Sequence, residues 1–113
     1  MFYNAQTNNQ GQLQGRVVSV KELSEGKMAV ITLAIDNGKD KDGNKREASF
    51  PQVKSFHPNT YNQLVKGMLV RAYTHLSTDK YEKAGETRYS QDTIADCIEF
   101  LESKSAVQAR EDF

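Results

Sequence analysis

Five strand-like segments and one helix-like segment follow one another in the order β-β-β-α-β-β along the 113 residues of the chain. Together with turn residues between the segments, this order predicts an all-β fold with one short helix. The architecture that fits best is a five-stranded Greek-key barrel of OB type, with the helix between strands three and four. An SH3-like barrel is the alternative, but it lacks that helix. The length fits one domain with a modest core.

The first three strands are predicted from β-branched and alternating residues. Residues 13–23 (LQGRVVSVKEL) form the first, and Glu25-Gly26 makes a turn. Residues 27–36 (KMAVITLAID) form the second, and because apolar side chains occupy both of its faces, we expect both to be buried. A charged hairpin loop with an Asp42-Gly43 turn leads to the third, residues 47–56 (EASFPQVKSF). Pro51 cannot donate a ladder hydrogen bond, which indicates an edge or a bulge.

The second half supplies the helix and two more strands. Residues 57–67 (HPNTYNQLVKG) are predicted to be helical, with Asn59 or Thr60 as the cap and Gly67 at the end. Residues 68–78 and 88–102 form strands four and five, and residues 77–91 form a hairpin loop with Ala84-Gly85 at its turn. Cys97 lies within a strand pattern, and we expect it to pack as a small apolar residue.

The domain organisation follows from these elements. Residues 1–11 are polar and unpatterned, typical of a flexible arm, and residues 12–102 make the barrel domain. Residues 103–113 form a short acidic tail of helix-forming residues with little to bury. No signal peptide or membrane-length apolar segment is recognisable, and the single cysteine cannot form an internal disulfide. We expect a soluble, cytoplasmic protein without membrane association.

The net charge of zero conceals an asymmetry. Residues 1–90 carry 13 Lys/Arg and 9 Asp/Glu, whereas residues 91–113 carry 2 and 6, so the body is at +4 and the end at −4. A basic body suits a polyanionic partner, and ordinary surface charge is the alternative.

Catalytic and metal-binding patterns are absent from the sequence. His57 and His75 are the only histidines, and nothing provides a nucleophile, a base and an orienting group together. The DKDGNK loop superficially resembles a calcium loop, but Gly38 and Ser49 stand where that loop needs carboxylates. The alternative is that Asp36, Asp40 and Asp42 form a carboxylate cluster for a metal-dependent nuclease, although Lys39 and Lys41 interrupt it. We expect no enzyme activity, no cofactor and no metal.

Nucleic-acid binding has the stronger support. Both long loops mix basic with polar residues, and aromatic residues stand at their joints. The candidate DNA-binding residues are Phe50, Phe56, Tyr81, Tyr89, Lys39, Lys41, Lys45, Arg46, Lys54, Lys80, Lys83 and Arg88. Single strands are held by this combination, because cations follow the phosphates and each stacked base contributes roughly 1–3 kcal/mol. Phe50 and Phe56 are an even number of residues apart, which places them on one face of an unbulged strand, with core packing as the alternative.

Several of these segments also carry a family resemblance. They are ITLAID before the KDKDG loop, ASFPQVKSF, LVKGMLV after the helix, and LSTDKYEKAGETRY, with its L-x-T-x-K-aromatic and G-x-x-R-Y spacing. From Gln12 to Glu102 the chain resembles the bacterial and phage single-stranded DNA-binding proteins, the SSB family. The resemblance implies an OB-fold homo-oligomer, usually a tetramer, with a dimer as the other option. It also implies DNA wrapping without sequence preference, with Phe50, Phe56 and Tyr81 matching base-stacking positions and Lys80 and Arg88 matching phosphate-contacting positions.

The resemblance extends to the end of the chain. AREDF is similar to the family's acidic tail with a terminal Phe, which implies docking of replication or recombination proteins through Glu111, Asp112 and Phe113. A frayed helix end is the alternative. We expect sequence-independent binding and protection of single-stranded DNA in replication, recombination or repair, in a phage- or mobile-element-encoded protein. An OB-fold protein-interaction module of primosome type, with weak nucleic-acid binding, is the other candidate.

Overall fold

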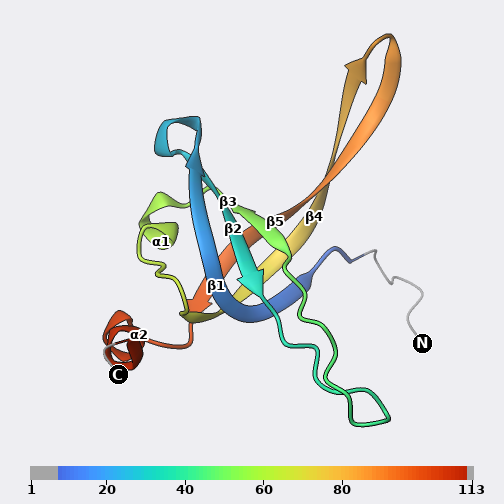
Figure 1. Ribbon diagram of the computed structural model, residues 1–113. Helices are drawn as coiled ribbons and strands as arrows, with labels where there is room; N and C mark the ends of the chain where they lie inside the picture. Colours follow the sequence, from blue (N-terminus) through green and yellow to red (C-terminus); the bar gives the residue numbers. More distant parts are fainter. Residues whose placement is uncertain (1–7, 112–113) are drawn as a thin grey trace, which may run out of the picture.

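The computed structural model describes residues 8–111 of the chain. Its elements are β1 (Gly11–Leu23), the 3-10 turn η1 (Ser24–Gly26), β2 (Met28–Ala34), β3 (Gln52–Ser55), α1 (Pro58–Tyr61), β4 (Leu69–Lys83), β5 (Glu86–Phe100) and α2 (Lys104–Glu111) (Figure 1). The five strands and the helix between the third and the fourth confirm the predicted order. Residues 1–7 of the predicted arm lie outside the described residues.

The strands close into a barrel in the order β1-β2-β3-β5-β4, with β4 pairing back to β1. All neighbours are antiparallel except β3 and β5, which are parallel. β1 pairs with two neighbouring strands: its first half pairs with β4 and its second half with β2. Gly15 lies where it passes between them, and a Cβ there would stand 2.5 Å from the Ala34 carbonyl oxygen. Only glycine permits this approach, and the topology confirms the predicted OB-type barrel.

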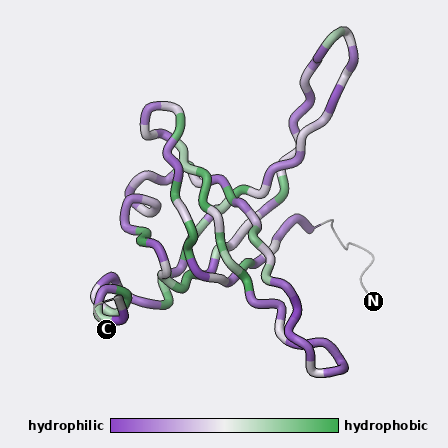
Figure 2. Tube along the Cα trace, in the orientation of Figure 1, coloured by the Kyte–Doolittle hydropathy of each residue, from purple (hydrophilic) through white to green (hydrophobic). Residues whose placement is uncertain are grey.

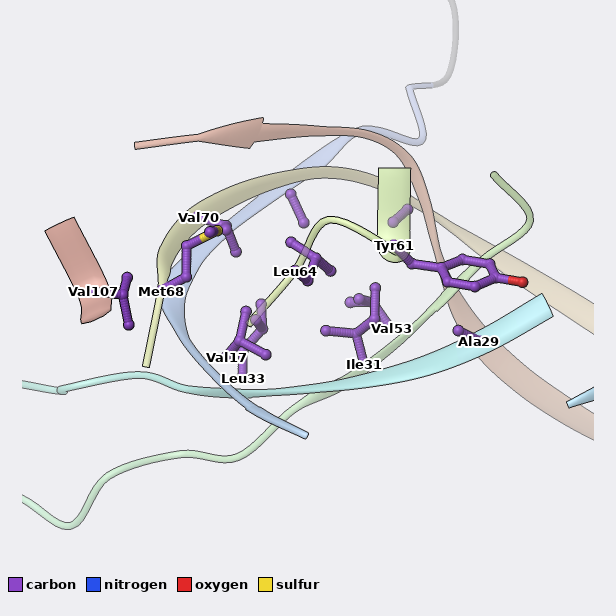
Figure 3. Close-up of a cluster of buried hydrophobic side chains, with 12 residues drawn as sticks. Val17, Ala29, Ile31, Leu33, Val53, Tyr61, Leu64, Met68, Val70 and Val107 are labelled. Carbon is purple, nitrogen blue, oxygen red and sulfur yellow. The ribbon is translucent and has the colours of Figure 1, made fainter. Parts of the chain in front are cut away.

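The barrel interior is a single apolar core (Figure 3). Ala29, Ile31 and Leu33 of β2 point inward and are fully buried, while the residues between them are only partly buried. The prediction that both faces of β2 are buried was therefore wrong, because a barrel strand has one interior face and one outward face. The core also contains Val17, Val53, Tyr61, Leu64, Met68, Val70, Ala72, Ala95 and Val107.

A register shift in β5 explains the position of Cys97. Tyr73 pairs with Cys97, but the next residue of β4, Thr74, pairs with Ala95, so Asp96 is an inserted residue. Ala95 is buried and Ile98 packs against the core, whereas Cys97 is exposed. The prediction of a packed cysteine was wrong, because a bulge reverses the alternation of side chains along a strand.

Helix α1 is shorter than predicted. It begins at Pro58, a residue suited to the first helical position, and His57 rather than Asn59 or Thr60 precedes it as the cap residue. The following residues form turns, and Leu64 and Met68 are thereby buried in the core. Tyr61 closes this end, since its buried hydroxyl donates to the Gly26 carbonyl oxygen. Burial, with a smaller effect of the Glu22 carboxylate, raises the pKa of Tyr61.

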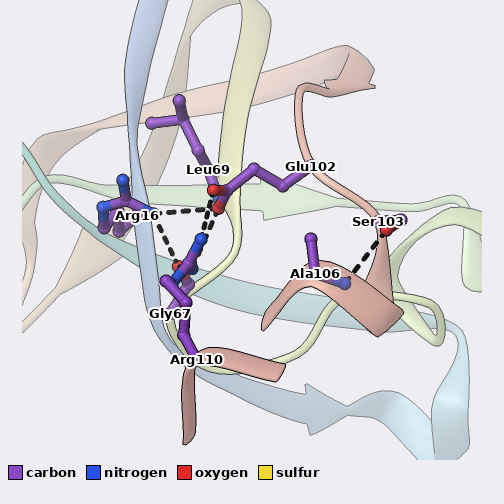
Figure 4. Close-up of polar contacts among 7 residues, drawn as sticks. All are labelled: Arg16, Gly67, Leu69, Glu102, Ser103, Ala106 and Arg110. Carbon is purple, nitrogen blue, oxygen red and sulfur yellow. Dashed lines mark hydrogen bonds and ion pairs between the residues drawn. The ribbon is translucent and has the colours of Figure 1, made fainter. Parts of the chain in front are cut away.

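The C-terminal helix packs onto the barrel, although the sequence suggested that it had little to bury. Val107 of α2 is 2% exposed and belongs to the core. Glu102, just before α2, accepts from the Leu69 backbone N–H at 2.9 Å and pairs with Arg16 at 2.9 Å and with Arg110 (Figure 4). These donors, Arg110 first and the Leu69 amide second, lower the pKa of Glu102 to about 2. Both arginines also donate to the Gly67 carbonyl oxygen, so one carboxylate joins β1, β4 and α2.

Candidate nucleic-acid interface

Two hydrophilic segments extend from the barrel (Figures 1 and 2). One is the loop of residues 36–50, between β2 and β3, which we call the 36–50 loop. The other is the outer part of β4 and β5, residues 77–91, which we call the ribbon. No helix within residues 8–111 has the length and apolar character needed to cross a membrane. The same part of the chain has no group of three or more His, Cys, Asp or Glu residues arranged to hold a metal ion.

The ribbon is a regular hairpin rather than the predicted loop. β4 and β5 remain paired from Val70 and Phe100 out to Lys83 and Glu86. Ala84 and Gly85 connect them with φ values of 54° and 80°, and two positive φ values are the signature of a type I′ turn, whose twist matches that of the strands. The candidate residues in this region are therefore held on a β ladder.

The ladder sorts these residues onto two faces. Tyr81 lies opposite Arg88, and the adjacent pair places Tyr89 opposite Lys80. Because directly opposed side chains share a face and successive ones alternate, the two tyrosines lie on opposite faces of the ribbon. Their side chains are exposed by 44% for Tyr81 and 66% for Tyr89.

The two faces have different continuations on the barrel. Val70, Ala72 and Thr74 of β4 are buried, so Lys80 and Tyr89 lie on the face that continues the barrel interior. Tyr81, by contrast, lies on the face that continues the outer surface, together with Arg88 and Lys83. Tyr81 thus shares its face with Arg88 rather than with Lys80, its neighbour in sequence.

Phe50 and Phe56 flank β3 and both are exposed, by 61% and 51%. Core packing, the alternative for each ring, does not occur. Because β3 spans only Gln52–Ser55, the two rings stand beyond its opposite ends rather than within one strand. Lys54 faces outward between them, alternating with buried Val53, and its ammonium pairs with Asp92 of β5 at 3.1 Å.

The 36–50 loop presents the other basic candidates. Lys39, Lys41, Lys45 and Arg46 are all exposed, and none of them takes part in an ion pair within residues 8–111. The loop doubles back on itself, because Lys39 and Lys45 form an antiparallel bridge and the Arg46 N–H donates to the Gly38 carbonyl oxygen at 2.9 Å. Its four cations therefore lie on a folded loop and remain available to an anionic ligand.

One residue that anchors the ribbon had no signal in the sequence. The Asn9 amide donates to the Leu76 carbonyl oxygen at 2.7 Å and accepts from the Leu76 N–H at 2.8 Å. It thereby extends the β1–β4 pairing by a side chain, at the base of the ribbon. In sequence Asn9 is one of several polar residues before the first strand, so no local pattern could distinguish it. The predicted partner-binding residues lie at the other end: Glu111 is the last residue of α2, and Asp112 and Phe113 lie outside the described residues.

Solved structures similar to this fold include single-stranded DNA-binding proteins of three organisms. A Plasmodium falciparum SSB in complex with single-stranded DNA matches with a TM-score of 0.60 and 23% identity, over 88% of this chain and 99% of the other. The yeast mitochondrial protein Rim1 matches with a TM-score of 0.60 and 17% identity, over 84% and 96%. A small single-stranded DNA-binding protein from Streptomyces coelicolor gives 0.55 and 20%, over 83% and 95%. These similarities establish the OB-type fold.

Sequence relatives establish the family, although no family model matches the chain. Single-stranded DNA-binding protein 2 of Streptococcus agalactiae is 29% identical over 104 residues, covering 89% of this chain and 79% of the relative. Single-stranded DNA-binding protein 1 of Staphylococcus aureus is 33% identical over 108 residues, covering 88% and 69%. A relative at 33% identity, matched over 88% of this chain and 69% of its own length, shows that the chain belongs to the single-stranded DNA-binding protein family.

Proposed function

We propose that this protein binds single-stranded DNA without sequence preference and protects it during replication, recombination or repair. The observation that carries the proposal is the exposure of four aromatic rings, Phe50, Phe56, Tyr81 and Tyr89, each on or beside a segment that bears cations. An aromatic ring exposed to water forgoes the hydrophobic free energy that burial would contribute. Such exposed rings suit unpaired bases, because every base has a face that can stack. Family membership supports the same ligand.

The geometry assigns base stacking and phosphate binding to different residues. Phe50 and Phe56 at the two ends of β3 and Tyr81 on the outward face of the ribbon would stack bases, each for roughly 1–3 kcal/mol. The exposed cations of the 36–50 loop would neutralise phosphates, which makes the affinity depend on salt. Lys54 and Arg88 are each joined to an acidic neighbour, Asp92 and Glu86, and would have to exchange that neighbour for a phosphate.

The remaining properties in the proposal rest on the family. The protein would act without enzyme activity in the cytoplasm, as a homo-oligomer with a tetramer favoured over a dimer. Leu76 and Phe100 are exposed apolar residues that are not among the proposed base-stacking residues. They offer apolar surface for subunit contact. Glu111, Asp112 and Phe113 would dock replication or recombination proteins.

One titration tests the proposal. Intrinsic tyrosine fluorescence is followed while oligo-dT is added at low salt, and the mass of free and bound protein is measured by light scattering. Tight binding with quenching supports the function, because a stacked tyrosine loses emission. Absence of binding at low salt would contradict it and favour an OB-fold protein-interaction module, whose affinity for nucleic acid is weak.

A further inference from the structure

The 36–50 loop contains one residue that is less exposed than all the others. Asp40 is half-buried, whereas every other residue of the loop is exposed. It lies between Lys39 and Lys41, two of the cations assigned to phosphate binding. A carboxylate in this position repels a polyanion, so its presence needs a structural reason.

Hydrogen bonds give that reason. The Asp40 carboxylate oxygen Oδ1 accepts from the backbone N–H of Asp42 and from that of Asn44, both at 2.9 Å. The Asp40 N–H donates to the Asn44 carbonyl oxygen at 2.8 Å, and the Asp40 carbonyl oxygen accepts from the Gly43 N–H at 3.1 Å. Asp40 therefore forms hydrogen bonds with the backbone of three successive residues of the loop tip, Asp42, Gly43 and Asn44. Gly43, at φ 82°, supplies the positive φ of this turn.

Asp42, two residues later, provides a natural comparison. It carries the same charge in the same loop tip and is exposed. Among the described residues its carboxylate accepts no hydrogen bond and joins no ion pair. The two aspartates thus repel phosphates alike, while only Asp40 shapes the loop.

We propose that Asp40 is a positioning residue for single-stranded DNA binding. Its carboxylate fixes the tip of the loop, and this fixed tip holds Lys39, Lys41 and Lys45 in one arrangement relative to the phosphates. Without the acceptor, the tip samples many conformations, and binding must then overcome the ordering entropy of each lysine. This role rests on the proposed function, because it acts on DNA only through those lysines.

The experiment compares four variants, D40A, D40N, D42A and D42N, in oligo-dT titrations at several salt concentrations. All four remove one negative charge, which by itself tightens DNA binding. Only D40A also removes the acceptor, since Asn keeps an oxygen that can take both N–H groups. We expect D40N, D42A and D42N to bind as tightly as the unmodified protein or more tightly. D40A is expected to bind more weakly at every salt concentration, by roughly 2–12-fold for each lysine that binding must order. Its salt slope should stay unchanged, because the number of neutralised phosphates stays the same.

NMR spectra of the backbone amides, recorded without DNA, provide a second measurement that does not depend on binding. In D40A the Asp42 and Asn44 amide resonances should move, and in D40N they should return towards their original positions. Equal affinities of D40A and D42A, in a protein that does bind oligo-dT, would overturn the positioning role and leave the proposed function standing. If the unmodified protein binds no oligo-dT at low salt, the proposed function itself fails, and the role of Asp40 fails with it. Melting curves on all four variants check that each is folded.

Discussion

Tyr81 lies directly opposite Arg88 on one face of the β4–β5 ribbon, while Tyr89 and Lys80 form the equivalent pair on the other face. On each face, therefore, a ring of one strand lies directly opposite a cation of the other. A base and its phosphate could engage such a pair together, because cross-strand neighbours have Cβ atoms only about 5 Å apart. The ribbon's contribution to DNA binding can consequently be tested one face at a time.

Changing Tyr81 to Ala should weaken oligo-dT binding by roughly 5–150-fold, the equivalent of one missing stack of about 1–3 kcal/mol. Changing it to Phe should cost little, because stacking needs the ring and not the hydroxyl. Neither variant should unfold the protein, since the ring is 44% exposed on a polar hairpin. Affinity and melting temperature are measured on both. Full affinity in the Ala variant, or a melting temperature several degrees lower, would show that Tyr81 serves packing instead.

The effect of Tyr89→Ala on affinity should add to that of Tyr81→Ala. The rings lie on opposite faces, so they cannot share one base, and independent sites add within about 0.5 kcal/mol. The measurement is a double-mutant cycle on oligo-dT affinity. A strongly non-additive double variant would mean that one segment of DNA wraps round the ribbon and contacts both rings.

Salt dependence tests the phosphate contacts. The logarithm of the affinity should fall linearly with the logarithm of the salt concentration, by about 0.7 for each phosphate neutralised. The seven cations of the two projecting segments set a ceiling near −5 per chain for this slope; they are Lys39, Lys41, Lys45, Arg46, Lys80, Lys83 and Arg88. Duplex DNA of the same length should bind far more weakly, because its bases are not free to stack. An affinity that does not change with salt would exclude this mechanism.

Acid should release the Glu102 junction. Its pKa falls from 4.5 to about 2 in the folded chain, so the unfolded chain binds the proton more readily. The stabilisation is therefore complete above pH 4.5 and disappears as the pH falls from there towards 2. Glu102→Gln should melt at a lower temperature at neutral pH, and the difference from the unmodified protein should shrink across that acid range. Glu99→Gln is the control, because Glu99 pairs with Arg71 at 3.7 Å and none of its hydrogen bonds within residues 8–111 reaches α2. A difference that stays constant with pH would mean that charge at Glu102 is not what holds the junction.

Deletion of residues 111–113 tests the end of the chain. If its two acidic side chains compete with DNA, oligo-dT binding should become tighter after the deletion. If the end docks replication proteins, a pull-down of such a partner should fail after the deletion. The double variant Glu111→Gln, Asp112→Asn is the matched control, since it removes charge and keeps Phe113. No change in either measurement would leave the end of the chain without a role in binding.

The sequence by itself determined the order of strands and helix along the chain and the surface character of the candidate site. Alternating apolar residues such as Ala29, Ile31 and Leu33 predict a strand because the side-chain period of a strand is local. Turn signals such as Asp42-Gly43 and Ala84-Gly85 are local too, and both stand at turns of the structure. The aromatic residues among polar neighbours, Tyr81 and Tyr89, were found for the same reason.

Only the tertiary structure decided which side chains share a face. The bulge at Asp96 exposes Cys97, and the cross-strand register pairs Tyr81 with Arg88 rather than with Lys80. Val107 is buried, and Glu102 joins α2 to β1 and β4 through partners 86 and 33 residues away. Register, bulges and such long-range ion pairs depend on contacts between distant segments, and no local pattern of residues encodes them. The sequence therefore specified the elements, and closure of the barrel specified the arrangement of the residues they carry.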